Sequence, residues 1–447
     1  MSSLATPRWP LTALSQAWRN ALGAIAMLWL ATAAGAAMVF LTQMLLARAL
    51  GAASYGLFAS SLAMVGMVAP MAGFGLAQFW LRVYGGEGWH ANRWLLPSVR
   101  FLGITTALTM AIIVAWALVL APPDATVMLL VMLPVVGSVL VAALISSKLR
   151  LEERHRALAL WQLMTPGGRL VVALLLLIAP GMGSPGVAVG YGAISLGVAA
   201  LGAPQLRAML HGGLALQGHG ARPYGGVFRI TPAARPPGLR SLWSQAWPFG
   251  LAATLYPIFF QTGTVLVKYF DGNTEAGIFG IALAVMSAIY LIPATLYQKF
   301  LLSKQQRWAV HDPATFWRIY RHGNRAMLAG GVLLALLMVA TAPWGVPLAF
   351  GPAYRPVVPV LMILAACIPL RFLSTSVGSA LLNERHMRYR VVAMGFCALL
   401  VVVLASCLIP AYRARGAAVA TVVGELAMLL LLVAGVRRFY PAQDRPR

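Results

Sequence analysis

Long apolar runs without a polar stripe dominate this chain. The run from Thr42 to Arg82 carries no charged residue between Arg48 and Arg82, whereas an amphipathic helix of a soluble protein shows polar positions on every turn. A helix that is apolar all round is buried in a large core or faces lipid. The pattern therefore predicts helices that cross a membrane.

Apolar segments of about 20 residues, the length that spans a bilayer as a helix, recur along the whole chain. Turns rich in glycine, proline or charge separate them. The pattern predicts an all-α integral membrane protein with twelve transmembrane helices, at residues 22–47, 55–80, 101–121, 126–147, 158–180, 185–205, 247–269, 276–298, 326–346, 356–382, 391–411 and 416–436.

Composition and charge agree with this interpretation. Hydrophobic residues make up 60% of the chain and charged residues 10%, whereas about a quarter of a soluble domain is charged. The net charge of +24 is unevenly placed: with a cytoplasmic N-terminus, the inside segments hold 27 of the 34 Lys and Arg residues and the outside turns hold 5. This bias follows the positive-inside rule. We therefore expect both termini in the cytoplasm, and we do not expect nucleic-acid binding.

The two halves of the chain resemble each other. LGAASYGLFA from Leu50 returns as DGNTEAGIFG from Asp271, an offset of 221 residues, and GVAVGY from Gly186 returns as GAAVAT from Gly416, an offset of 230. Two similar offsets in the same order predict two copies of one six-helix module. Parallel repeats of this kind are typical of transporters, which bind substrate between the repeats.

The repeat and the charges divide the chain into five parts. We expect an interfacial N-terminal segment (1–21), an N-lobe (22–205), a cytoplasmic linker rich in Gly, Pro and Arg (206–241), a C-lobe (242–436) and a cytoplasmic tail (437–447). The uncharged run 21–47 is longer than the core of a signal peptide, so we expect a retained first helix. Prolines and glycines predict breaks in the fifth, seventh and tenth helices, which a membrane protein tolerates beside a water-filled cavity.

Charged residues inside the predicted spans are the candidate site residues, because each costs about 2.5–3.5 kcal/mol at the centre of a helix. Arg169 and Arg371 lie within spans, and Glu425 is the only carboxylate deep in one. Arg48 and Lys268 lie near the outer ends of the first and seventh helices, at nearly equivalent places in the two repeats. Four cations predict a cavity that binds an anion, most simply a phosphate or diphosphate.

Each of these residues also has a structural interpretation. Arg48 and Lys268 would only reach the outer interface along their apolar stems, and Arg169 would lie near the inner surface if its span is shifted. Glu425 would either form a structural ion pair with an arginine or carry a coupling proton. The sequence does not separate these alternatives.

Signals for an enzyme or a metal site are weak. The segment Gly181–Gly186 fits the pattern G-x-G-x-x-G, but it lies in a turn between two spans, and no acidic residue follows about twenty positions later. The seven histidines lie in predicted inside segments without metal-ligand spacing, and the three cysteines lie in apolar runs. We expect no enzymatic activity, no cofactor and no metal.

Several segments resemble a known family. LLARALGAASYGLFA (residues 45–59), GFGLAQFWLR (73–82), LAFGPAYRPVVPVLMILAACIPLRFL (348–373) and RGAAVATVVGE (415–425) look like the corresponding helices of bacterial polysaccharide flippases. These are the Wzx-type translocators of the multidrug/oligosaccharidyl-lipid/polysaccharide (MOP) exporter superfamily.

The resemblance implies a MATE-like architecture of two six-helix lobes that open alternately to either side of the bacterial inner membrane. It implies a polyprenyl-diphosphate-linked oligosaccharide as substrate, such as an O-antigen, exopolysaccharide or capsule repeat unit on undecaprenyl diphosphate, moved from the cytoplasmic to the outer leaflet. Membrane lipids and the polysaccharide polymerase and chain-length machinery are the implied partners.

Two other functions stay open. A cation-coupled exporter of small drugs is disfavoured, because the first helix, between Ala21 and Ala47, lacks the carboxylate that the related multidrug exporters use. A non-transporting or enzymatic partner in polysaccharide assembly is the second. A glycosyltransferase or polymerase needs a sizeable loop outside the membrane, and every predicted outside turn is short.

Overall fold

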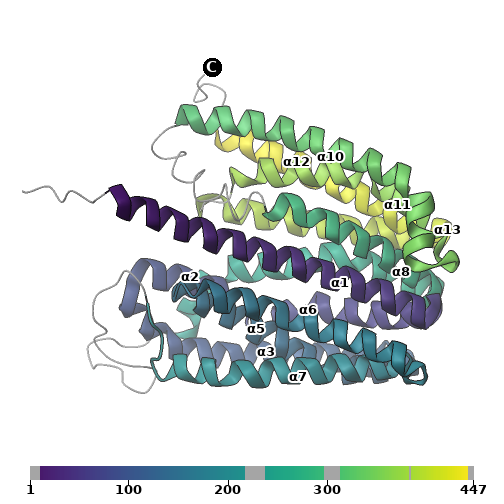
Figure 1. Cartoon of the computed structure of the whole chain (residues 1–447), viewed down its shortest axis with the longest axis horizontal. Coiled ribbons are helices and arrows are strands. Elements are labelled where there is room, and N and C mark those ends of the chain that lie inside the picture. The colour runs from purple at the N-terminus through teal and green to yellow at the C-terminus, as the bar shows by residue number, and fades with distance from the viewer. Residues whose placement is uncertain (1–10, 217–236, 296–312, 382–383, 441–447) are drawn as a thin grey trace, which may run out of the picture.

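The computed structural model is a bundle of long helices that run nearly parallel to one another (Figure 1). The structure describes residues 11–216, 237–295, 313–381 and 384–440. Within these ranges the chain is helical, with short connecting turns and no strand. The predicted all-α fold is confirmed.

The N-terminal half forms the lower part of the bundle in Figure 1, and the C-terminal half forms the upper part. The helices of the first half are α1 (Leu11–Val68), α2 (Leu76–Glu87), α3 (Leu95–Val119), α4 (Pro123–Val131), α5 (Pro134–Leu151), α6 (His155–Ile178) and α7 (Gly183–Leu210). Those of the second half are α8 (Leu239–Thr295), α10 (Pro313–Phe350), α11 (Val357–Leu364), α12 (Cys367–Ser379) and α13 (Glu384–Phe439). Short 3-10 turns are η1 (Ala69–Met71), η2 (Gly88–Trp94), η3 (Pro180–Met182) and η5 (Pro352–Tyr354).

Eight continuous stretches of the described residues are long and apolar enough to cross a membrane. Three helices among them bend sharply, α1 at Gly51, α8 at Gly272 and α13 at Arg413, so each of these makes two crossings. The first stretch, 26–119, also contains α3 as a third crossing. Divided in this way, the described helices supply the twelve crossings that the sequence predicts, apart from 296–298 and 382, which lie outside the described residues.

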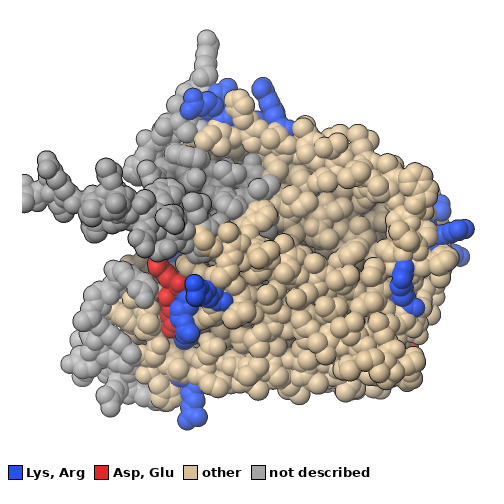
Figure 2. Space-filling view, viewed as in Figure 1, with Lys and Arg blue, Asp and Glu red and all other residues tan. Residues whose placement is uncertain are grey.

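The surface of the bundle is that of a membrane protein. Leu333 and Leu399 are 68% and 63% exposed, and many other large apolar side chains also face outward. Figure 2 shows Lys and Arg gathered toward the ends of one face, with a broad band between them that has no charged side chain among the described residues in view. A band of this kind suits the hydrocarbon core of a bilayer.

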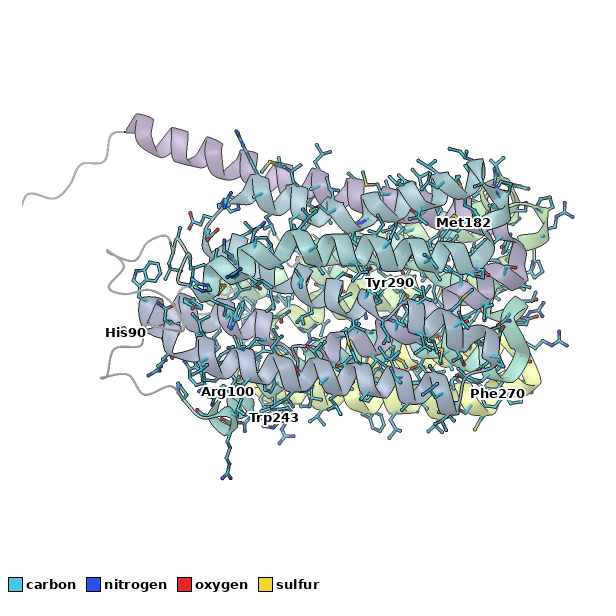
Figure 3. All side chains as sticks on the ribbon, turned by 90° about the horizontal axis from the view of Figure 1, so that it is seen from below. His90, Arg100, Met182, Trp243, Phe270 and Tyr290 are labelled. Carbon is cyan, nitrogen blue, oxygen red and sulfur yellow. The ribbon has the colours of Figure 1, made fainter. Side chains whose placement is uncertain are left out.

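The helix ends separate into two groups, as the predicted alternation of turns requires. Figure 3 shows His90, Arg100 and Trp243 at one end of the bundle and Met182 and Phe270 at the other. The first three are in or next to predicted inside segments, and the last two are in or next to predicted outside turns. Successive turns therefore lie at opposite ends of the bundle.

The backbone repeats between the two halves at the offsets found in the sequence. Gly51 (φ 74°, ψ 168°) and Gly272 (φ 85°, ψ −173°) share one conformation at an offset of 221 residues. Gly183 (φ 57°, ψ −169°) and Arg413 (φ 52°, ψ −138°) share a second at an offset of 230. Positive φ angles of this kind favour glycine, which explains why the motifs containing Gly51 and Gly272 are recognisable in the sequence.

Two expectations about helix breaks are wrong and one is confirmed. The tenth span is broken as predicted, since α11 ends at Leu364 and α12 begins at Cys367. In contrast, α6 continues through Pro166, and α8 continues through Pro248 and Pro257. A proline removes one backbone hydrogen bond and bends a helix, but neighbouring helices hold these segments in helical geometry. The turn expected between the first two spans is likewise a single bend at Gly51.

The two halves meet mainly along α1 and α8, the paired helices that contain the equivalent bends. The described residues reach into the predicted linker from both sides, to residue 216 and from residue 237. The rest of the predicted linker, residues 1–10 and residues 441–447 lie outside the described residues. The lobe and linker boundaries therefore stay predictions.

Candidate functional site

A cavity of about 490 Å³ lies within the C-terminal half of the bundle, between α8, α12 and α13. Its size falls in the range of about 300–1,000 Å³ that is usual for small-molecule sites. Its polar lining consists of Tyr256 and Tyr290 from α8, Arg371, Ser374 and Thr375 from α12, and Arg390 from α13. Its apolar lining includes Phe259, Met387, Met394, Met428 and Leu432.

Helical spacing explains how one short helix contributes several of these groups. Arg371, Ser374, Thr375 and Gly378 line the cavity from α12, and their spacing of three, four and seven residues places them on one face. The hydroxyls of Ser374 and Thr375 donate to the carbonyl oxygen of Arg371 at 3.1 and 2.8 Å. Their oxygen lone pairs remain available as acceptors, and this face of α12 is the polar wall of the cavity.

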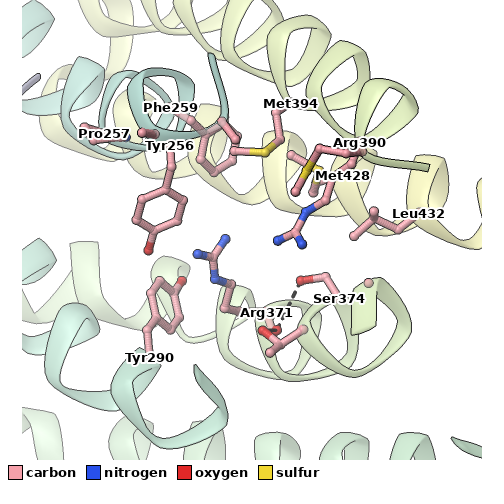
Figure 4. A pocket seen from close by; sticks show the side chains of 15 residues that line it. Tyr256, Pro257, Phe259, Tyr290, Arg371, Ser374, Arg390, Met394, Met428 and Leu432 are labelled. Atoms are coloured by element: carbon pink, nitrogen blue, oxygen red, sulfur yellow. Dashed lines mark hydrogen bonds between the residues drawn. The ribbon is translucent and has the colours of Figure 1, made fainter. Parts of the chain in front are cut away.

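Arg371 is held between two aromatic rings. Its guanidinium carbon lies 4.8 Å from the ring centre of Tyr256 and 5.4 Å from that of Tyr290. Cation–π contacts of this kind stabilise a planar guanidinium on an aromatic face. In Figure 4 the Arg371 side chain rises from α12 into the space between the two tyrosines.

Glu425 on α13 is the anionic partner of Arg371. The Arg371 Nη1 atom donates to the Glu425 Oε1 atom at 3.3 Å. The Arg371 side chain is 19% exposed, and the Glu425 side chain is 1% exposed. The structure thus brings together two of the five residues that the sequence singles out.

A second cation, Arg390, lines the same cavity and is absent from the sequence prediction. Figure 4 shows its guanidinium pointing into the cavity, toward Arg371 and Ser374. The sequence analysis assigns Arg390 to an inside segment, because the eleventh span is placed from residue 391. In the structure α13 begins at Glu384, so Arg390 lies on a continuous helix one turn before Met394. That helical spacing beside an apolar run is the signal that could have identified it.

The other three predicted cations do not line this cavity. Arg169 on α6 lies in the N-terminal half, with its guanidinium carbon 4.9 Å from the ring centre of the buried Tyr191. Arg48 donates from Nη2 to the carbonyl oxygen of Leu348. Lys268 is only 6% exposed, and its Nζ atom has no hydrogen-bond partner among the described residues. Arg48 and Lys268 lie three or four residues before the equivalent bends at Gly51 and Gly272, as the repeat predicts.

The cavity chemistry suits recognition of an anion. The guanidinium groups of Arg371 and Arg390 both line the cavity, and guanidinium forks match phosphate oxygens well. The tyrosine rings and methionines give the same cavity apolar faces. Among the described residues, no group of three or more His, Cys, Asp or Glu side chains is arranged to hold a metal ion.

The family comparison covers the first three-fifths of the chain. Residues 22–299 match the family model described as Polysaccharide biosynthesis protein. The chain belongs to this family. No curated protein matches the chain.

Solved structures show the same fold over almost the whole length. The lipid II flippase MurJ in an inward closed conformation superposes with a TM-score of 0.69 at 14% identity, over 94% of this chain and 89% of that one. An inward-facing multidrug resistance transporter of the MATE family and MOP superfamily gives 0.68 at 14% identity, over 92% and 96%. A MOP superfamily transporter from Pyrococcus furiosus gives 0.55 at 16% identity, over 93% and 95%.

These comparisons confirm the expected relationship to the polysaccharide branch of the MOP superfamily. This chain, a member of the polysaccharide biosynthesis family, has the MATE-like architecture of two parallel six-helix repeats. The fold is that of transporters and flippases.

Proposed function

We propose that this protein is a flippase of the bacterial inner membrane, which moves a polyprenyl-diphosphate-linked oligosaccharide from the cytoplasmic to the outer leaflet. The observation that carries the proposal is the cavity where Arg371 and Arg390 point toward one space, in a chain of the polysaccharide biosynthesis family. The diphosphate is the anion shared by all such carriers, whatever sugar they bear.

The arginines would lower the free-energy cost of moving a charged diphosphate across the bilayer. A diphosphate cannot enter hydrocarbon without compensation, because desolvating an unpaired charge is very costly. Two guanidinium groups supply charge-assisted hydrogen bonds in its place. The polyprenyl tail would stay in lipid between helices, and alternate opening of the two repeats would expose the sugar on either side.

The cavity dimensions support a headgroup site rather than a site for the whole glycan. About 490 Å³ accommodates a diphosphate and an adjoining sugar, so the remaining sugars would extend beyond this cavity. The tyrosine rings that flank Arg371 would offer apolar faces for that first sugar. Arg48, Arg169 and Lys268 would guide the anion elsewhere along its route.

The proposal extends to pathway and placement. We place the protein in the synthesis of an O-antigen, exopolysaccharide or capsule on undecaprenyl diphosphate, with both termini in the cytoplasm and with the polymerase and chain-length machinery as partners. The protein acts as a transporter and catalyses no covalent step. Its product is the same lipid-linked unit on the opposite leaflet.

Deletion of the gene tests the proposal directly. We expect the lipid-linked oligosaccharide to accumulate on the cytoplasmic face, protected from a glycosidase or lectin in spheroplasts and accessible in inverted vesicles. Complementation with the wild type should restore outward movement, and an Arg371→Ala variant that is inserted at normal levels should not. Arg100→Ala, an exposed residue at the end of α3, is the matched control. Accumulation on the outer face would contradict a flippase and indicate a later step.

A further inference from the structure

Arg371 is already paired with a carboxylate in this structure. Glu425 is almost fully buried, and one of its oxygen atoms lies 3.3 Å from Arg371 Nη1. A diphosphate that binds Arg371 must therefore compete with Glu425 for the same guanidinium. Glu425 thus occupies a position at Arg371 that a phosphate oxygen would take.

The pair has the geometry of an exchangeable contact rather than a finished structural ion pair. Only one oxygen of Glu425 meets Arg371, and 3.3 Å is longer than the usual 2.7–2.9 Å or so of a charge-assisted hydrogen bond. The other oxygen, Oε2, is buried without a hydrogen-bond partner among the described residues. A buried pair that serves stability needs its remaining polar atoms satisfied.

The surroundings of Glu425 offer no second strong cation contact. The titratable and charged groups that interact with it are Tyr290 from α8, Cys367 and Arg371 from α12, and Cys397 from the first arm of α13. Within the described residues, Arg371 is the only cation that forms an ion pair with Glu425. Arg390 instead faces the cavity, where the incoming anion would lie.

Charge balance then determines what happens when the site fills. A disubstituted diphosphate carries two negative charges, which two arginines can neutralise. A third negative charge on Glu425, left without its partner at 1% exposure, would be an isolated buried carboxylate. Such a group takes up a proton rather than remain charged.

We propose that Glu425 couples headgroup binding to proton uptake: the diphosphate displaces Glu425 from Arg371, and the freed carboxylate binds one proton from water. The Arg371–Glu425 contact is replaced by an Arg371–phosphate contact and a new O–H bond on Glu425. On release of the anion the proton leaves and the pair re-forms. This inference rests on the proposed function and adds its coupling ion.

Binding of a soluble analogue to the purified protein in nanodiscs tests the coupling. The probe is a short prenyl chain joined through a diphosphate to N-acetylglucosamine, whose disubstituted diphosphate keeps a constant charge. Linkage makes wild-type affinity rise as pH falls, by up to about tenfold per pH unit across the range where Glu425 exchanges its proton. A pH-indicator dye in weak buffer should show uptake of about one proton per bound probe.

Glu425→Gln removes the exchangeable proton. We expect its affinity to be independent of pH and close to the wild-type value at low pH, with no proton uptake on binding. Glu152→Gln is the matched control, because Glu152 is also buried and paired, with Lys148 at 2.8 Å, but lies outside the cavity. Its pH profile should follow the wild type.

The outcomes separate this inference from the proposed function. Wild-type binding that does not change with pH and takes up no proton would overturn the coupling and leave the flippase standing. The absence of binding at every pH would overturn both. Because the proton count is made on the wild type, the result stands even if Glu425→Gln fails to fold.

Discussion

Gly277 faces Gly56 across the junction of the two repeats so closely that a Cβ atom added at Gly277 would lie 3.2 Å from the Cα atom of Gly56. The contact is reciprocal: a Cβ at Gly56 would overlap the carbonyl oxygen of Asn273, and a Cβ at Gly277 would overlap that of Ala52. These partners are related by the same offset of 221 residues. The two glycines therefore mark the pseudo-two-fold axis, where one repeat meets the other with backbone against backbone.

The first prediction follows from this contact. Gly277→Ala should lower the free energy of unfolding of the purified protein by about 1–3 kcal/mol, because the backbone at Ala52 cannot move aside as a flexible side chain could. Gly66→Ala on α1 is the control, since an added Cβ there meets nothing within 4 Å. It should leave the unfolding temperature unchanged or raise it slightly. Equal destabilisation by both substitutions would contradict the close packing of the repeats.

The second prediction concerns the chemistry of Arg371. Arg371→Lys should reduce transport about tenfold or more, although it keeps the positive charge, because an ammonium cannot stack between the rings of Tyr256 and Tyr290 or present a planar fork to a diphosphate. The measurement is transport of the lipid-linked unit in the deletion strain, normalised to the amount of inserted protein. Full activity of the lysine variant would show that charge alone is sufficient.

The sequence predicts the helix bends and the paired charges better than it predicts which residues line the cavity. The repeat offsets locate the bends at Gly51 and Gly272, because a positive φ favours glycine and leaves a visible motif. Arg371 and Glu425 are identifiable because a charge within an apolar span is costly and therefore needs a partner. Both the glycine at a positive φ and the charge in an apolar span can be recognised from the residues nearby in the sequence.

Which cations share a cavity depends on how each helix is rotated about its axis, and composition does not encode that rotation. The sequence does not identify Arg390 as a cavity residue, because the predicted eleventh span begins one residue later and Arg390 is then counted with the cytoplasmic loop. The same limit applies to Pro166 and Pro257, since tertiary packing decides whether a proline breaks a helix or only bends it.

The third prediction tests Arg390 against a neighbour. Arg390→Gln should weaken binding of the diphosphate-linked probe about tenfold to a hundredfold, which corresponds to the loss of a charge-assisted hydrogen bond to an anion. Arg388→Gln, two residues earlier on the same helix, removes an exposed arginine beside Trp247 that does not line the cavity. Its affinity should match the wild type. If both variants lose affinity equally, general surface charge is responsible rather than the cavity.

The fourth prediction uses the repeat to find a strained residue. Arg413 occupies the backbone conformation that Gly183 adopts in the other repeat, with φ at 52° and ψ at −138°, a region costly for any residue with a Cβ. Its ion pair with Glu275 is long, at 3.8 Å, and the Arg413 side chain is 72% exposed, so that pair contributes little. Arg413→Gly should therefore stabilise the protein by about 1 kcal/mol.

Arg415→Gly is the control, because it should change the stability in the opposite direction. Arg415 is exposed and lies in the helical part of α13 just after the bend, where glycine costs about 0.5–1 kcal/mol relative to a good helix former. Thermal unfolding of the two purified variants should thus shift in opposite directions from the wild type. A fall in stability for both would mean that Arg413 is not strained, because the backbone there would then be one that an arginine accepts without cost.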